Sequence, residues 1–163
     1  MVAQRLEKAL EGLVVLIADS NPYMRRLTRM MLTNLGIKST YESSDGVAAL
    51  DAIRAVNPDV MIVDWDMPVL DGSEVMRIVR APGLFPKANL PIIMLTDLGL
   101  QSRVSAAIRL GVHEFLVKPI SPKTLQQRLL GIILNPRPMV RAGKYYIPMP
   151  RRRVDFAEVI NEA

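Results

Sequence analysis

The chain contains no cysteine and only one histidine, His113, among its 163 residues. The absence of thiols excludes disulfides and thiolate metal sites, which fits a reducing cytosol. A single imidazole leaves too few ligands for a histidine-based metal cluster. No apolar run approaches the roughly 18 residues that span a bilayer, and the first residues lack the apolar core of a signal peptide. These absences predict a cytoplasmic protein with no membrane segment.

Half of the residues are apolar, which predicts a globular protein with a well-packed core. The length favours one domain. The net charge of +5 is uneven, because residues 136–163 carry six Lys/Arg against three Asp/Glu and so supply +3 of it. We therefore expect a short helical lead-in over residues 1–12, a nearly charge-balanced domain over 13–134, and a basic tail over 135–163 that is too short to form a separate domain.

The body of the chain alternates strand-like and helix-like segments. The apolar runs predict strands near 13–18, 38–43, 59–63, 91–95 and 113–117. Amphipathic spacing predicts helices over 22–35, 46–56, 72–80, 100–110 and 121–134. Five strand–helix units of this length predict an α/β fold with a parallel sheet covered by helices on both faces.

Four of these strands end at a polar residue suited to phosphate chemistry. Asp19, Asp64, Thr96 and Lys118 each follow a buried apolar run. In open parallel sheets, ligands bind outside the carboxyl ends of the strands. Two carboxylates, a hydroxyl and an ammonium at that edge therefore predict a phosphate site. A single aspartate at a strand end is more often a turn former or helix cap. The prediction therefore depends on all four residues occurring together.

The order and spacing of these residues resemble the receiver domain of two-component response regulators, over roughly residues 12–134. The matching segments are Val14 to Arg26, Val63 to Gly72, and Val117-Lys118-Pro119-Ile120. The resemblance is greatest to single-domain, chemotaxis-type receivers, and it extends to Asp64-Trp65 and Met24-Arg25-Arg26. It implies a doubly wound, flavodoxin-like (βα)5 fold with strand order 2-1-3-4-5.

The resemblance also implies roles for the site residues. Asp64 is the expected phosphoacceptor, with Lys118 and Thr96 contacting the phosphoryl group and Phe115 as an aromatic switch residue. Asp19, Asp64 and the backbone carbonyl of Asp66 are expected to hold Mg²⁺. These roles fit the physics, since a carboxylate can act as a nucleophile and phosphoryl transfer spreads negative charge that cations stabilise.

The chain departs from the family pattern at Ser20, where receivers usually carry a second acid beside Asp19. A hydroxyl is a weaker ligand for a hard cation than a carboxylate, so we expect reduced Mg²⁺ affinity. Ser20 holding the ion through a water, and the side chain of Asp66 turning towards the pocket, are two alternatives for completing the metal shell.

Three functions remain open from the sequence. The first is a response regulator phosphorylated on Asp64 by a histidine kinase or phosphotransfer protein and acting on a downstream protein. The second is a degenerate receiver that binds proteins without phosphorylation. The third is a haloacid-dehalogenase-type phosphatase, because Asp64-Trp65-Asp66 matches its Asp-x-Asp motif; that motif belongs on a first strand, and here it follows the third. We expect no turnover enzyme.

Partner surfaces are less defined by the sequence. The family's usual dimer face, made of the fourth helix, fifth strand and fifth helix of the repeat, would carry charged residues: Arg103, Arg109, Glu114, Lys123 and Arg128. Arg25 and Arg26 are expected on a solvated helix face, and Met30 in the core. Arg151-Arg152-Arg153 near two tyrosines form too small a basic footprint to favour nucleic acid; a tail that packs on the domain or binds a protein is favoured.

Overall fold

The computed structural model describes residues 1–85, 87–97 and 100–149. Seven strands lie in this part of the chain: β1 (Val14–Ala18), β2 (Ser39–Ser43), β3 (Val60–Asp64), β4 (Ile92–Thr96), β5 (Glu114–Val117), β6 (Met139–Ala142) and β7 (Tyr145–Pro148). The helices there are α1 (Val2–Glu11), α2 (Pro22–Asn34), α3 (Gly46–Val56), α4 (Gly72–Arg80), α5 (Gln101–Leu110) and α6 (Pro122–Leu134).

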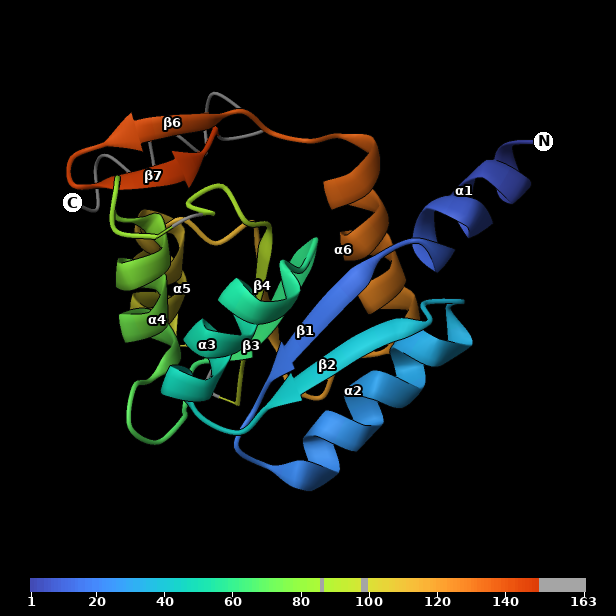
Figure 1. Ribbon diagram of the computed structural model, residues 1–163, viewed down its shortest axis with the longest axis horizontal. Coiled ribbons are helices and arrows are strands. Elements are labelled where there is room, and N and C mark those ends of the chain that lie inside the picture. The colour runs from blue at the N-terminus through green and yellow to red at the C-terminus, as the bar shows by residue number, and fades with distance from the viewer. Residues whose placement is uncertain (86, 98–99, 150–163) are drawn as a thin grey trace.

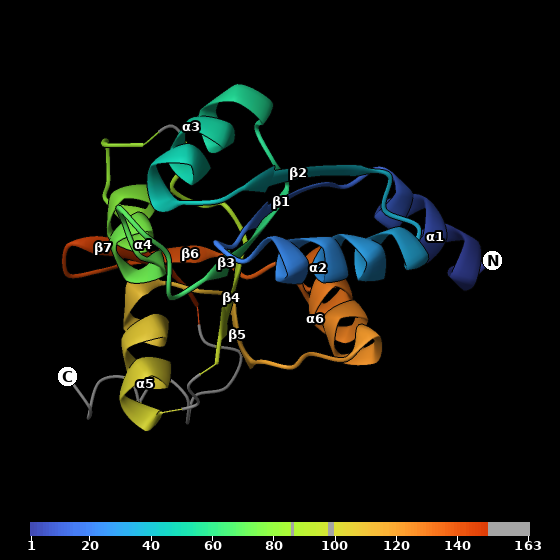
Figure 2. The same ribbon diagram turned by 90° about the horizontal axis from the view of Figure 1, so that it is seen from below.

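Strands β1 to β5 form one parallel sheet in the order β2-β1-β3-β4-β5. Helices α3, α4 and α5 cover one face of this sheet, and α1, α2 and α6 lie on the other side (Figures 1 and 2). The predicted flavodoxin-like architecture and its strand order are therefore confirmed, and each predicted strand and helix is present within two residues of its expected ends.

The sheet divides the core into two apolar layers, because successive residues of a strand point to opposite faces. Leu16, Met61 and Val63 pack in the layer under α3, α4 and α5. Val15 and Ile62 pack in the layer under α2 and α6. Strand β3 is buried along its whole length, which explains why it reads as a continuous apolar run.

Local capping fixes where several helices begin near the carboxyl edge of the sheet. Asn21 caps α2 by accepting the backbone N–H groups of Tyr23 and Met24, ahead of Pro22 at the first helical position. Asp71 and Glu74 form a capping box at the start of α4. These caps hold the loops after β1 and β3, which carry the polar residues of interest.

The segment after α6 forms an antiparallel hairpin, β6–β7, that the sequence reading did not predict. Strand β7 packs against α4 and α5, with Ile147 buried and the carbonyl of Tyr146 close to Gly111 (Figure 1). Gly111 has φ +93°, and a Cβ there would lie 2.7 Å from the Tyr146 oxygen. This part of the tail packs on the domain, as one of the two expectations for it stated.

A fully buried arginine anchors the same region. Arg80, at the end of α4, donates to the carbonyl oxygens of Gly111 at 3.0 Å and Ala88 at 2.7 Å, and its Nη2 lies 3.3 Å from Nδ1 of His113. The ring of His113 also accepts the N–H of Ile92. His113 thus has a structural role, and buried polar groups here are satisfied in the manner that burial requires.

Two minor expectations were wrong. Arg25 is not merely solvated, because it donates to the backbone oxygen of Asp19 at 2.7 Å and lies 3.4 Å from Glu42. Met30 is 57% exposed and lies outside the core, since it occupies the outer side of α2. The expectations for Arg151-Arg152-Arg153 and the stretch beyond lie outside the described residues. Over the described ranges, the structure has no helix with the length and apolar character to cross a bilayer.

Candidate functional site

The parallel sheet brings the four predicted polar residues to one edge. Asp64 and Thr96 are the last residues of β3 and β4, while Asp19 and Lys118 directly follow β1 and β5. Asp19, Asp64 and Thr96 are buried, at 3%, 5% and 0% exposure. The side chain of Lys118 is also buried, at 6%. Each side chain is positioned by an apolar strand whose residues pack alternately into the two core layers, so a shift of register would exchange the residues of the two layers and disrupt the packing of both.

Lys118 joins the two carboxylates of the site. Its Nζ lies 3.0 Å from Oδ2 of Asp19 and 3.2 Å from Oδ2 of Asp64. The remaining oxygen of Asp19 accepts the backbone N–H of Asn21 at 2.9 Å. An ammonium between two buried carboxylates offsets the like-charge repulsion and desolvation that the pair would otherwise suffer. The site therefore has a cation where added negative charge would develop.

The pKa of the Asp64 carboxyl is raised from its ordinary 3.8 to about 6. Burial is the main cause, and the charge of Asp19 adds to it, while Lys118 acts in the opposite direction. Burial alone would lower the pKa of Lys118, but its hydrogen bond to Asp19 and the charge of Asp64 raise it, so the ammonium is retained. A buried carboxylate beside a firmly charged lysine fits a nucleophile for phosphorus.

The oxygen atoms at this edge are suited to a small hard cation, although the site supplies two carboxylates where a typical receiver would supply three. Asp19 and Asp64 supply carboxylate oxygens, and the hydroxyl of Ser20, in the loop after β1, donates to the backbone oxygen of Asp66, in the loop after β3, at 3.5 Å. Across the ranges described, no cluster of three or more acidic, cysteine or histidine side chains gathers to hold a metal. Mg²⁺ commonly uses one or two carboxylates and keeps several waters, so the residues present fit it.

The side chain of Asp66 is bound by an arginine in this structure, and it would have to leave that partner to join a metal shell. Arg103, on α5, holds it through two hydrogen bonds, of 2.9 Å to Oδ2 and 3.1 Å to Oδ1. The same guanidinium donates to Oγ1 of Thr96 at 3.0 Å and lies 5.1 Å from the centre of the Trp65 ring. Sequence reasoning had placed Arg103 on a dimer face and missed this role, which only the approach of α5 to the loop after β3 makes visible.

Phe115 lies on β5 and is partly buried against the core layer under α3, α4 and α5. Gly72, at the start of α4, lets the chain turn tightly behind Asp64: a Cβ at Gly72 would lie 2.6 Å from the backbone oxygen of Asp64. The loop after β3 is therefore pinned at both ends, by the strand and by this close approach. A side chain at Gly72 would therefore displace the backbone of Asp64.

The proposed dimer face is built from α5, β5 and α6 in the structure. Two of its charges pair within the chain, because Arg128 donates to Glu114 at 3.1 Å. Arg103 is directed to Asp66 instead of outward. Ile108 and Val117 on this face are exposed, at 39% and 46%. The face thus offers apolar side chains with fewer outward charges than the sequence suggested.

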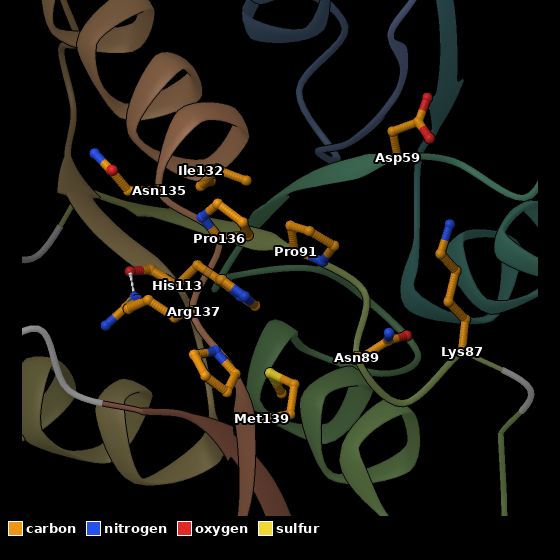
Figure 3. Close-up of a pocket in the computed structure, with 11 residues that line it drawn as sticks. Asp59, Lys87, Asn89, Pro91, His113, Ile132, Asn135, Pro136, Arg137 and Met139 are labelled. Carbon is orange, nitrogen blue, oxygen red and sulfur yellow. Dashed lines mark hydrogen bonds between the residues drawn. The ribbon is translucent and has the colours of Figure 1, made fainter.

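A cavity of about 420 Å³ lies at the opposite edge of the sheet, away from Asp64. Figure 3 shows its lining, which comes from residues just before β3, β4 and β5, from the end of α6 and from the segment after α6. Lys87 donates to the backbone oxygen of Pro58 at 2.5 Å, and Arg137 donates to that of His113. Lys87 connects the segment before β4 to the one before β3, and Arg137 connects the segment after α6 to the one before β5. The cavity therefore lies between the tail segment and the five-stranded domain.

Comparisons with known proteins agree with this geometry. The family model of the response regulator receiver domain matches residues 15–130. A chemotaxis protein CheY homolog of Campylobacter jejuni is 36% identical over 121 residues, covering 73% of this chain and 91% of that protein. The receiver domain of the Francisella response regulator 1452 is 30% identical with a TM-score of 0.65, covering 72% of this chain and 93% of that one.

A third solved structure is the CheX-CheY-BeF3-Mg complex from Borrelia burgdorferi. It is 24% identical, with a TM-score of 0.67, and covers 74% of this chain and 88% of that one. At that identity the likeness supports the fold alone.

Proposed function

This chain belongs to the response regulator receiver domain family, and we propose from that premise that it accepts a phosphoryl group on Asp64 and signals through protein contacts. The observation that carries the proposal is the buried ammonium of Lys118, which lies within 3.2 Å of both Asp19 and Asp64 at the carboxyl edge of the sheet. The expected donor is the phosphohistidine of a histidine kinase or of a phosphotransfer protein in the cytoplasm.

In the proposed reaction, a carboxylate oxygen of Asp64 attacks phosphorus in line. The new O–P bond forms as the P–N bond of phosphohistidine breaks, and the nitrogen keeps the electron pair and takes a proton. Lys118 balances negative charge that appears on the phosphoryl oxygens. The hydroxyl of Thr96 is the expected hydrogen-bond donor to the same group, and Phe115 is the expected aromatic residue that repacks when Thr96 moves.

Asp19, Asp64 and the backbone carbonyl of Asp66 would hold Mg²⁺, with Ser20 contributing through a water, and the bound ion would neutralise charge on the phosphoryl oxygens. The missing acid at Ser20 predicts that this ion binds more weakly than in a site with three acids.

The expected partners are a kinase and a downstream protein. The relatives named as chemotaxis proteins support a function in signalling through protein binding rather than through turnover of a substrate. The surface of α5, β5 and α6 is the expected contact face, including for a homodimer. Its exposed Ile108 and Val117 supply apolar area for such contacts.

A direct test is phosphorylation by a small donor. Wild type and Asp64→Asn are incubated with Mg²⁺ and acetyl phosphate or phosphoramidate, and intact mass is followed together with the fluorescence of Trp65. A phosphoryl adduct on wild type alone supports the proposal. No adduct at high Mg²⁺ favours the second candidate, a receiver that binds proteins without phosphorylation, which the loss of an acid at Ser20 motivates.

A further inference from the structure

One arginine contacts three residues around the site, of which Thr96 is the one that the proposed reaction requires to move. Arg103 lies on α5, and its guanidinium binds both carboxylate oxygens of Asp66 and Oγ1 of Thr96. It also covers the ring of Trp65 at 5.1 Å. We call the set Arg103, Asp66 and Trp65 the rim latch. The rim latch connects the loop after β3 to helix α5, and through the same guanidinium α5 also contacts Thr96 at the end of β4.

The contacts of the rim latch are of a kind that arginine makes well. A planar guanidinium with two parallel N–H donors matches a carboxylate, and its face stacks on an aromatic ring. The hydrogen bond to Asp66 raises the pKa of Arg103, so the guanidinium stays charged. Its side chain is only 21% exposed, although that of Asp66 is 52% exposed. The latch is therefore partly shielded from solvent on the arginine side.

Thr96 is the point of competition. Resting on the proposed function, its hydroxyl has to approach a phosphoryl group on Asp64, yet in this structure Oγ1 is 3.0 Å from Nη1 of Arg103. We propose that Arg103 is a positioning residue that holds Thr96 in the unphosphorylated arrangement, so that the closed rim latch and an occupied Asp64 oppose each other. By linkage, the free energy that closes the latch lowers the affinity of Asp64 for a phosphoryl-like ligand by the same amount.

Simple electrostatics and the latch predict opposite changes in the affinity for a phosphoryl-like anion when Arg103 is replaced, so one measurement separates them. At saturating Mg²⁺ the ligand that is titrated is the beryllium fluoride anion. An arginine near the site attracts that anion, so removal of the arginine alone would weaken its binding, whereas release of Thr96 would strengthen it. Saturating Mg²⁺ also keeps any gain in metal affinity from the freed Asp66 carboxylate out of the comparison, so tighter binding under this condition is the result that opening of the latch predicts.

Beryllium fluoride with Mg²⁺ is the probe, because it binds reversibly where a phosphoryl group would be attached. Its affinity is measured by calorimetry, which does not depend on Trp65, for wild type, Arg103→Gln, Arg103→Lys and Arg109→Gln. Arg109 is the matched control, an exposed arginine on the same helix whose described contact is to the backbone oxygen of Ser105. Far-UV circular dichroism checks that each variant is folded, and Arg103→Lys keeps the charge if the glutamine variant is unstable.

We expect Arg103→Gln to bind the probe about five-fold more tightly than wild type, the effect of one net hydrogen bond. Arg103→Lys should lie between the two, and Arg109→Gln should match wild type. Trp65 emission of unliganded Arg103→Gln should differ from that of wild type, because the stacked cation is gone. Unchanged or weaker binding by Arg103→Gln overturns the latch, whereas no binding by any variant, wild type included, overturns the proposed function and the latch together.

Discussion

Asp64 has to be ionised before its oxygen attacks phosphorus, and burial makes that ionisation costly. Its pKa of about 6 means that the reactive carboxylate fraction rises as pH increases through that value. We therefore expect the initial rate of adduct formation with phosphoramidate to rise between pH 5 and 7 and then level off. Because a cation beside Asp64 favours the ionised form, the midpoint should move lower as Mg²⁺ is raised.

The measurement is intact mass against time, corrected for the pH dependence of the donor's own hydrolysis. A rate that stays flat from pH 5 to 8 at low Mg²⁺ would contradict a raised pKa at this carboxyl. So would a rate that falls across the same range.

Ser20 is the second residue whose identity has a measurable consequence. Replacing it with aspartate restores a third carboxylate beside Asp19 and Asp64, and the affinity of oxygen sites for hard cations grows with the number of charged ligands. We expect Ser20→Asp to bind Mg²⁺ about ten-fold more tightly, on the scale of one added charged ligand, in a titration followed by Trp65 fluorescence. Ser39→Asp, an exposed serine at the start of β2, adds the same charge at the opposite edge and should change nothing.

At the scale of elements, the start of α4 and the end of β3 share one tight space. A methyl group at Gly72 would lie 2.6 Å from the backbone oxygen of Asp64 and 2.9 Å from Cα of Trp65, so the backbone has to shift. We expect Gly72→Ala to lower the free energy of unfolding by about 2 kcal/mol, the cost of overpacking, and to slow phosphorylation of Asp64.

Urea denaturation and the mass assay measure these two effects. Gly12→Ala is the control, because its added Cβ would be 3.6 Å from the nearest atom, an ordinary contact. If Gly72→Ala were as stable and as reactive as wild type, the close approach would not matter to the site.

The elements were predictable because short continuous apolar runs alternate with amphipathic segments of helical period along this chain, and the strand order followed from the resemblance to receiver domains. The site residues were predictable for a related reason: Asp64, Thr96 and Lys118 follow apolar strands, and parallel topology brings such ends together. The reach of Arg103 to Asp66 was not, since a charge on an amphipathic helix is normally solvated and only the tertiary approach of α5 directs it inward. Hairpin β6–β7 was missed because its strands have four residues each and are bounded by Pro138 and Pro148, so they carry little periodic signal.

At the scale of the whole molecule, the hairpin extends the core that the five-stranded unit builds. Ile147 is 4% exposed, and β7 packs on both α4 and α5. Removing most of such a side chain leaves a cavity and costs about 2 kcal/mol or more. We expect Ile147→Ala to lower the free energy of unfolding by about 2 kcal/mol in urea denaturation, whereas Lys144→Ala, at the exposed hairpin turn, should leave it unchanged. Equal stabilities would mean that the hairpin contributes no packing to the domain.

The position of the hairpin also turns α5 into a short lever. The helix has 10 residues and is about 15 Å long, with Arg103 near one end and Gly111, under the carbonyl of Tyr146, at the other. If α5 tilts at the end that carries Arg103, its other end at Gly111 is expected to move, and the β6–β7 hairpin that packs there is expected to be displaced with it. Because the chain has no cysteine, thiols introduced at Lys144 and at exposed Met30 would be unique attachment points for spin labels, whose separation would report that tilt as a ruler.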